Sequence, residues 1–294
     1  MSISTVAVTG GNGTIGRAIL AHLNDRGYET VNIARGKRRE EVSNGYVTAD
    51  LLDAGETYGA IAKADADAII HMGTIPGPGG HPQFQTYQSN VMSAVHVLEA
   101  SESLGLDACC LASSINAMGT EHQQRDPQVE YLPIDEDHPR TPDDEYGIAK
   151  HAMEVTADGF GRRPPTDLTL STLRYPWVTT KEEMREYLVQ PDRSLDALHD
   201  VHPSTGHQVL FSYLAMADAV SIARKAIEAD YGGHETFWAV AGDTTANVPT
   251  ADVVEEFYPD ADVREDLTGH EAFFDLSKAK RLLDWEPEHS WRDL

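Results

Sequence analysis

Short apolar runs alternate with helical patterns over the first 175 residues of the chain. The runs expected to form strands are 4–10, 29–34, 45–50, 67–73, 107–114 and 167–175. Between them, apolar residues at three- and four-residue spacing predict helices, of which 14–25 and 82–104 are the clearest. Strands that alternate with helices form a parallel sheet covered on both faces. The pattern therefore predicts a doubly wound α/β fold.

The regular alternation ends near Tyr175. Helices near 181–189, 216–229, 250–257 and 277–284 and a strand at 235–240 are expected beyond it. We divide the chain into a sheet domain, 1–175, and a smaller α/β annex, 176–294. The annex is expected to pack on the carboxyl edge of the sheet, where such folds bind ligands.

A glycine-rich sequence, TGGNGTIG, follows the first expected strand and opens the next helix. Such glycines permit a tight turn, a close backbone approach to a pyrophosphate and close helix–strand packing, and the helix N-terminus faces the phosphates. In this context the motif predicts a dinucleotide site in a Rossmann-type domain. The candidate cofactor-binding residues here are Gly10, Gly13, Thr14, Ile15 and Gly16.

The end of the second strand bears on the choice of cofactor. A NAD site commonly has an acidic residue there, whereas an arginine accommodates the 2′-phosphate of NADP. Here the sequence reads IARGKRREE, with Arg35 first among four basic residues and no acid before Glu40. The cluster favours NADP over NAD, and a solvated basic turn is the alternative. Asp50 is a candidate to bind the adenine or to begin the next helix.

A tyrosine and a lysine, Tyr146 and Lys150, lie four positions apart in DDEYGIAKHAME. On a helix they share one face, so the ammonium can stabilise a phenolate. Lowering a tyrosine pKa from ~10 to about 7 requires roughly 4 kcal/mol, to which the ammonium and a positive nicotinamide ring would contribute. Ser114, at the end of strand 107–114, would hold the reacting oxygen against Tyr146. This set predicts a general base beside a nicotinamide.

The charge balance excludes some partners. Asp and Glu total 48 against 23 Lys and Arg, a net charge of −25, and only 7 of the basic residues are lysine. Such a field repels nucleic acid and anionic membranes. Acid enrichment with lysine depletion favours a halophilic protein, because a Debye length of about 3 Å in 1 M salt makes the self-repulsion tolerable.

Several expectations concern what the chain lacks. Adjacent Cys109 and Cys110 suggest neither a disulfide framework nor a metal site. His71, His202 and His207 are expected to face solvent, and no metal-ligand spacing is evident. No apolar run approaches the ~18 residues that a membrane span needs, and the N-terminus does not read as a secretory signal. A cytoplasmic location is expected.

With these motifs in hand, the chain resembles the extended short-chain dehydrogenase/reductases, also called the NAD-dependent epimerase/dehydratase family. The resemblance extends through QSNVMSAVHVLEA, LASSINAMG, LRYPWV and DLSKAKRLLDWEP. It implies that Ser114, Tyr146 and Lys150 are catalytic. It also implies a homodimer paired through helices 83–104 and 146–161. The further cofactor-site residues that it implies are Asp50, Leu51, Met72, Gly73, Asn90 and Tyr175.

Departures from the family pattern narrow the substrate. The carboxylates that dehydratases carry after the catalytic strand are replaced by Ile115 and Asn116, which argues against dehydration. Trp177 stands where 4-epimerases acting on UDP-sugars commonly have asparagine. Uronate dehydrogenases match several local features, but Gln208 stands where an arginine would hold the substrate carboxylate. Thr74 and Ser114 complete the candidate substrate residues.

The motifs and the resemblance are compatible with three functions. The first is an NAD(P)-dependent dehydrogenase that interconverts a secondary alcohol and a carbonyl on a sugar-like small molecule. The second is a nucleotide-sugar 4-epimerase that keeps its NAD tightly bound. The third is a non-catalytic, cofactor-sensing regulator, against which an intact Ser114–Tyr146–Lys150 set argues.

Overall fold

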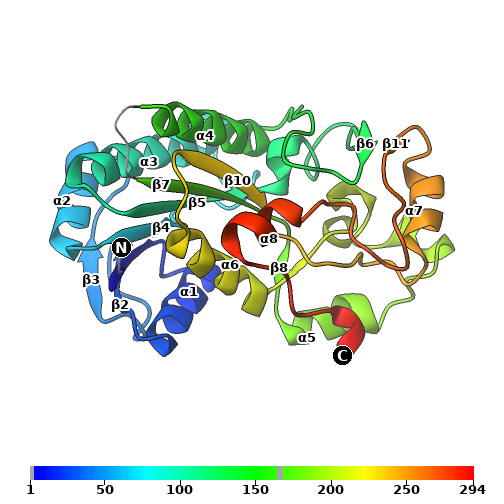
Figure 1. Ribbon diagram of the computed structural model, residues 1–294, viewed down its shortest axis with the longest axis horizontal. Helices are drawn as coiled ribbons and strands as arrows, with labels where there is room; N and C mark the ends of the chain where they lie inside the picture. The colour runs from blue at the N-terminus through cyan, green and yellow to red at the C-terminus, as the bar shows by residue number, and fades with distance from the viewer. Residues whose placement is uncertain (1–2, 164–167) are drawn as a thin grey trace.

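The computed structural model describes residues 3–163 and 168–294. Its centre is a seven-stranded sheet in the order β10-β7-β5-β4-β1-β2-β3, and every neighbouring pair is parallel (Figure 1). The fold is the doubly wound α/β arrangement that the sequence predicts. The strands are β1 (Thr5–Thr9), β2 (Glu29–Ala34), β3 (Gly45–Thr48), β4 (Ala68–His71), β5 (Ala108–Ser114), β7 (Thr169–Tyr175) and β10 (His234–Trp238).

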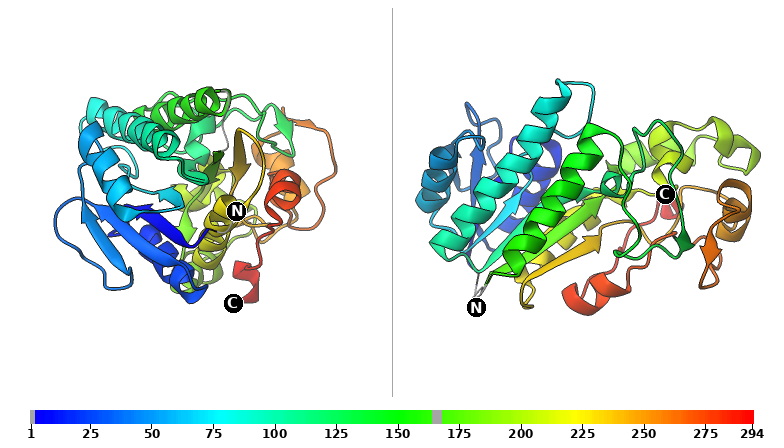
Figure 2. Two further views of the ribbon diagram at one scale, coloured as in Figure 1. Left: turned by 60° about the vertical axis from the view of Figure 1, so that its left-hand side comes forward. Right: turned by 90° about the horizontal axis from the view of Figure 1, so that it is seen from above.

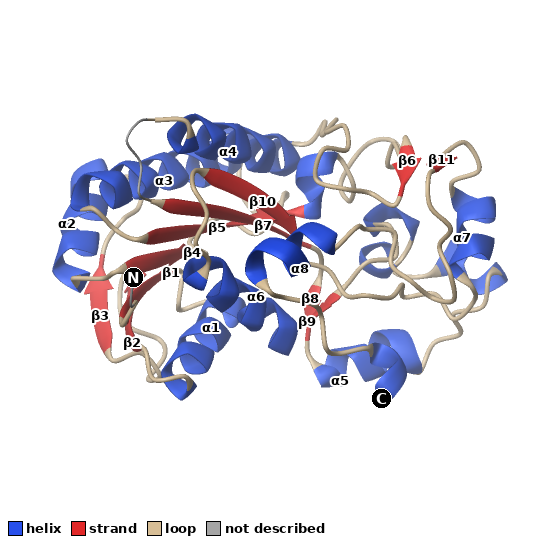
Figure 3. Cartoon of the chain, in the orientation of Figure 1, coloured by secondary structure: helices blue, strands red, loops and turns tan. Residues whose placement is uncertain are grey.

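Helices cover both faces of this sheet. On one face lie α2 (Ala54–Ala64), α3 (Gln83–Leu104) and α4 (Glu145–Gly161), and on the other α1 (Thr14–Asp25) and α6 (Met216–Glu228) (Figures 1 and 3). Successive residues of a strand point to opposite faces, so Cys109 packs in the core beneath α3 and α4 while Cys110 packs in the core beneath α1 and α6. Both faces are apolar, which explains why the strands read as continuous apolar runs.

The remaining elements form a lobe beyond the carboxyl edge of the sheet (Figure 2). It contains two short parallel pairs, β6 (Tyr131–Leu132) with β11 (Asp262–Val263) and β8 (Val178–Thr179) with β9 (Leu214–Ala215). Its helices are α5 (Lys181–Met184) and α7 (Thr250–Phe257), joined by short 3-10 turns, whereas α8 (Ser277–Leu283) packs against α6 and β10 of the main sheet. A π-helical turn, Arg185–Val189, continues α5, so the helix expected at 181–189 is only partly α-helical.

The chain crosses between sheet and lobe more than once. β10 and α6 follow Tyr175 in sequence but belong to the layers of the main sheet, whereas β6 precedes it and pairs in the lobe. The division at residue 175 stays a prediction. The strand expected at 167–175 begins at a residue outside the described part of the chain, and its described portion is β7.

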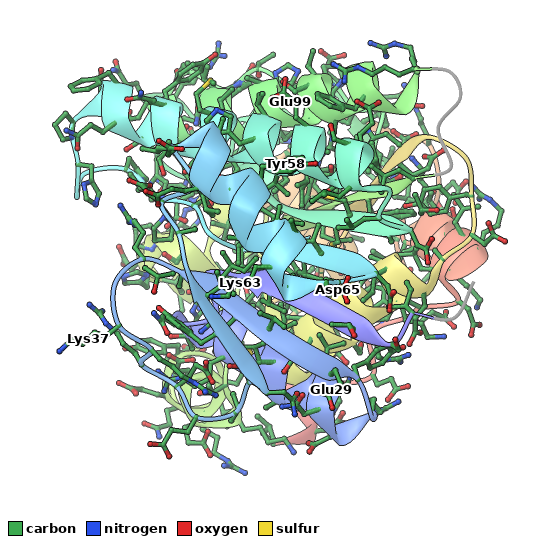
Figure 4. All side chains as sticks on the ribbon, turned by 90° about the vertical axis from the view of Figure 1, so that its left-hand side faces the viewer. Glu29, Lys37, Tyr58, Lys63, Asp65 and Glu99 are labelled. Atoms are coloured by element: carbon green, nitrogen blue, oxygen red, sulfur yellow. The ribbon has the colours of Figure 1, made fainter. Side chains whose placement is uncertain are left out.

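The flank formed by α2 and β3 exposes charged side chains as well as the ring of Tyr58, which is 45% exposed. Lys37, Lys63 and Asp65 project outward there, as Figure 4 shows. Within residues 3–163 and 168–294, no helix is long and apolar enough to cross a membrane.

Candidate active site

A cleft of about 1200 Å³ lies where the carboxyl ends of the central strands meet the lobe. It brings together most of the residues that the sequence singled out, although their roles stay predictions. Of the residues predicted for the site, those that line the cleft are Gly10, Gly13, Thr14, Ile15, Gly16, Arg35, Asp50, Leu51, Met72, Gly73, Thr74, Ser114, Ile115, Asn116, Tyr146, Lys150, Tyr175 and Trp177.

The glycine turn leaves room for a pyrophosphate beside α1. Gly10 has a φ of +69°, and a Cβ on it would lie 2.9 Å from the backbone of Gly73. A Cβ on Gly16 would lie 2.5 Å from the carbonyl oxygen of Gly10. No side chain caps the N-terminus of α1, where Gly13 is the N-cap residue. Its first-turn amides therefore face the cleft uncapped, an arrangement that fits a bound phosphate group.

Basic side chains flank the far end of the cleft, beside the end of β2. Arg35 and Arg39 line it and are exposed. Arg38 is turned away, since its Nε donates to the Glu40 carbonyl at 2.7 Å and pairs with the Glu40 carboxylate at 3.2 Å. Burial opposes ionisation of Glu40, but hydrogen bonds from Ser43 and Asn32 together with Arg38 lower its pKa to about 2. The nearest acid is thus already occupied and buried.

Tyr146 and Ser114 meet at the centre of the cleft. The Ser114 hydroxyl lies near enough to the Tyr146 hydroxyl to lower the pKa of the phenol. The Ser114 hydroxyl oxygen also accepts the backbone N–H of Asn116 at 3.2 Å, so its own proton is available to the tyrosine or to a ligand. Asp144 caps α4 by accepting the N–H groups of Tyr146 and Gly147, which fixes the start of the helix that carries the phenol.

Burial raises the pKa of Tyr146 to about 12, an effect that the hydrogen bond from Ser114 only partly offsets. Nearby Asp144 and Glu121 raise this pKa further. The pKa near 7 discussed from the sequence is therefore not a property of the protein groups alone. It requires additional positive charge in the cleft, which an oxidised nicotinamide ring supplies when bound.

Lys150 lies at the base of the cleft with 1% of its surface exposed. Its Nζ donates to the Ala112 carbonyl at 2.6 Å and to the Thr74 hydroxyl at 3.2 Å, and it lies 5.5 Å from the Tyr146 ring centroid. Burial lowers the pKa of Lys150 to about 7, although Glu154 raises it. Thr74, expected to contact substrate, thus holds the lysine.

A buried ion network lies behind Lys150, one turn further along α4. The Glu154 carboxylate accepts two bonds from Arg174 of β7, at 3.0 and 2.9 Å, and one from the Ser113 hydroxyl at 2.7 Å. Arg140 approaches the same carboxylate at 3.2 Å. Burial opposes the charge, but the paired arginines hold the pKa of Glu154 below its usual value. The network ties α4 to the ends of β5 and β7, which bear Ser114 and Tyr175.

His71, Asn90 and Gln208 lie elsewhere than the sequence predicts. His71 is wholly buried rather than solvent-facing, because it bridges Thr9 at 2.8 Å and Ser93 at 3.1 Å beneath the cleft. Burial lowers its pKa to about 3, so the ring is neutral. Asn90 is not among the cleft-lining residues, and its amide binds both backbone groups of Ile75. Gln208 is likewise outside the lining, on a 3-10 turn of the lobe.

Sequence reasoning missed several residues that line the substrate side of the cleft. Glu121 and His122 come from the irregular segment between β5 and α4, and Ser204 comes from a 3-10 turn of the lobe. None stands in a motif or a periodic pattern, so no local signal could have identified them. Across the described residues, no group of three or more His, Cys, Asp or Glu side chains is arranged to hold a metal.

The fold and this site define a class of protein. Residues 6–182 match the profile of the NAD dependent epimerase/dehydratase family, which is more than half of the chain. The protein belongs to this family, as the resemblance in its motifs predicted.

Curated relatives that match this chain share less than 30% of its residues over the aligned segments. A UDP-glucose 4-epimerase of Rhizobium leguminosarum bv. trifolii is 28% identical over 159 residues, covering 52% of this chain and 46% of the relative. The chain thus spans about half the length of the first curated relatives it matches.

Two solved structures share the fold. The UDP-glucose 4-epimerase of Thermotoga maritima is 19% identical with a TM-score of 0.70, covering 97% of this chain and 94% of that one. Glucuronic acid dehydrogenase of Chromohalobacter salexigens is 21% identical with a TM-score of 0.67, covering 99% and 88%.

Proposed function

We propose that the protein is an NAD(P)-dependent dehydrogenase that interconverts a secondary alcohol and a carbonyl on a sugar-like small molecule. The observation that carries this proposal is that Ser114, Tyr146 and the buried Lys150 line one cleft together with the glycine turn. Family membership supports it. A regulator that only senses a cofactor has no need of a buried lysine with a pKa of about 7 beside a phenol.

Each residue has a distinct role in the proposed reaction. The cofactor, held by the Gly10–Gly16 turn, supplies the hydride acceptor when bound. Ser114 donates a hydrogen bond to the substrate oxygen and orients it toward Tyr146. Tyr146 removes the hydroxyl proton as general base, and in the reverse direction it returns that proton to the carbonyl oxygen. Lys150, whose Nζ lies 5.5 Å from the centroid of the Tyr146 ring, stabilises the phenolate.

The test is a screen of sugars and sugar acids with NAD and NADP, in low and in molar salt, read by absorbance of the reduced nicotinamide. Tyr146→Phe keeps the ring and its packing but removes the proton acceptor. We expect it to lower turnover by about 10²–10⁴-fold, the usual contribution of a general base. Unchanged turnover in this variant would overturn the assignment of Tyr146.

NADP is proposed as the preferred cofactor. Arg35 and Arg39 border the cleft at the end of β2, where a 2′-phosphate would lie, and Glu40 is engaged with Arg38. Guanidinium groups bind phosphate through paired, charge-assisted hydrogen bonds. The solved structures among the relatives include complexes with NAD, so a preference for NADP would distinguish this chain from them.

A 4-epimerase is the second candidate, because both curated and structural relatives carry that name. An epimerase returns the hydride to the opposite face of the same sugar and shows no net reduction. Protein purified with tightly held NAD and inactive in the absorbance screen would favour it over the dehydrogenase.

A homodimer is proposed through α3 and α4, which run side by side (Figure 2, right). Their outer surfaces carry exposed apolar side chains, including Phe84 at 65% and Val155 at 50%. Ile148 lies two turns before Val155 on the same face of α4, with 41% exposed. A second copy of the same helix pair would cover this surface with equally apolar side chains.

We also propose that the protein is adapted to concentrated salt, because its net charge is −25 and it contains only 7 lysines. Activity and folding are then expected to increase from low to molar salt. The cytoplasmic location expected from the sequence stays a prediction.

A further inference from the structure

Charge is unevenly distributed along the cleft. Among its described lining residues, Arg35 and Arg39 lie at the end near β2, together with Asp50. Lys150 lies at the base, already bonded to Ala112 and Thr74. On the substrate side, the fixed charge is the carboxylate of Glu121. The end that must receive the substrate is therefore negative.

Glu121 is held in place by the lobe. Its Oε1 accepts the Ser204 hydroxyl at 2.6 Å, a contact across 83 residues of sequence. Its side chain is 21% exposed, and Oε2 lies 3.6 Å from Nε2 of His122. Arg125, which belongs to the same segment, is 3.8 Å from Asp143 and is not a lining residue.

Glu121 also lies within electrostatic reach of the reacting centre. Its charge is one of the causes that raise the pKa of Tyr146, alongside burial and Asp144. A substrate whose hydroxyl meets Ser114 and Tyr146 shares the cleft that Glu121 lines. Ionised carboxylates accept hydrogen bonds from hydroxyl groups and repel other anions.

We propose that Glu121 is a specificity-determining residue that restricts the substrate to an uncharged polyhydroxy compound, whose hydroxyl groups donate to its carboxylate. The inference rests on the proposed dehydrogenase function and narrows its substrate class. A uronate or a nucleotide diphosphate would set an anion against Glu121 with no described arginine lining that side. This separates the chain from relatives named for glucuronic acid and UDP-glucose.

The test measures binding rather than turnover, so failure of the proposed reaction is recognised separately by the Tyr146→Phe comparison. Calorimetric titrations of the protein saturated with NADPH compare D-glucose with D-glucuronate and D-galactose with D-galacturonate. Each pair differs only at C6, and the reduced cofactor prevents oxidation. We expect the neutral sugar of at least one pair to bind about tenfold or more tightly, since opposed like charges are costly at an interface.

Glu121→Gln removes the charge but keeps an acceptor for Ser204. This variant is expected to bring the two sugars to within about threefold, chiefly by strengthening uronate binding. Asp126→Asn is the matched control, because Asp126 is an 80% exposed carboxylate on the same segment and is not a lining residue. It should keep the wild-type preference.

The same titrations in 1 M salt provide a second test, because a Debye length of about 3 Å screens the repulsion between Glu121 and the uronate carboxylate. The preference for the neutral sugar is expected to shrink there. The proposal is overturned if the wild-type protein binds none of the four sugars. It is also overturned if, at low salt, the protein binds the uronates as tightly as the neutral sugars. A preference that persists in Glu121→Gln overturns it as well.

Discussion

Lys150→Met is expected to abolish activity yet stabilise the cofactor-free protein at neutral and acidic pH. The reason is the position of the ammonium, which is 1% exposed at the base of the cleft. Burial lowers the pKa of Lys150 from 10.5 to about 7, despite the opposing charge of Glu154. Folding therefore disfavours the proton that the unfolded chain readily binds.

The size and sign of this change in stability follow from the linkage between proton binding and folding. Between pH 7 and 10.5 the unfolded lysine binds a proton that the folded one releases, so this group makes stability rise with pH across that window. Below the folded pKa the full penalty applies, about 5 kcal/mol. Methionine removes this penalty but leaves the Ala112 carbonyl without its donor, which costs about 1–3 kcal/mol.

The net expectation is a variant about 2–4 kcal/mol more stable than wild type at pH 6. Near pH 10 the wild-type penalty has largely vanished, and the variant should be equal or less stable. Urea unfolding followed by tryptophan fluorescence, at constant salt and at both pH values, measures the difference. Lys63→Met is the control, since Lys63 projects from α2 into solvent (Figure 4).

A variant that loses the same stability at both pH values would refute the reasoning. It would mean that Lys150 carries its charge in the fold without penalty, so that burial does not govern its pKa. A pH-dependent change in Lys63→Met of similar size would point instead to the protein's overall charge.

Three further predictions concern other parts of the molecule. Glu154→Gln leaves buried Arg174 without its counter-charge, so it should lower the free energy of unfolding, measured by urea titration, by about 3–5 kcal/mol. A loss of less than about 1 kcal/mol would contradict the buried ion network. Arg39→Ala should raise KM for NADP about tenfold or more with little change for NAD, and an equal effect on both cofactors would argue against a phosphate contact. Val155→Arg should yield monomers in sedimentation velocity, while Val263→Arg on β11, at an equally exposed site, should not; dimers in both would refute the helix-pair interface.

The apparent conflict between a phenol with a pKa of about 12 and a catalytic base has a physical resolution. Burial opposes any charge in the cleft, for the phenolate and the ammonium alike. A bound oxidised cofactor adds positive charge next to Tyr146 and favours the phenolate. Under the proposed function, deprotonation of Tyr146 is thereby coupled to binding of the oxidised cofactor.

Most of the fold could be predicted from the sequence because its signals are local. The expected helix at 14–25 is α1, and the expected helix at 82–104 is α3 within one residue. Apolar runs buried on both faces identify the parallel strands, and a glycine turn between strand and helix identifies the end of the cleft where we propose that the dinucleotide binds. The pair Tyr146 and Lys150 is likewise readable, since helical spacing alone sets them on one face.

Contacts between distant segments could be decided only by the tertiary structure. Glu121 meets Ser204 across 83 residues, and Glu154 meets Arg174 across the junction of helix and sheet. His71 was expected to face solvent, but packing of its strand buries it between Thr9 and Ser93. Backbone periodicity specifies elements and faces, whereas the identity of the facing partner, and hence each side chain's charge state, depends on how those elements pack. For this protein the sequence determined the fold and the helical spacing of Tyr146 and Lys150, and packing determined the burial and the charged neighbours of these side chains.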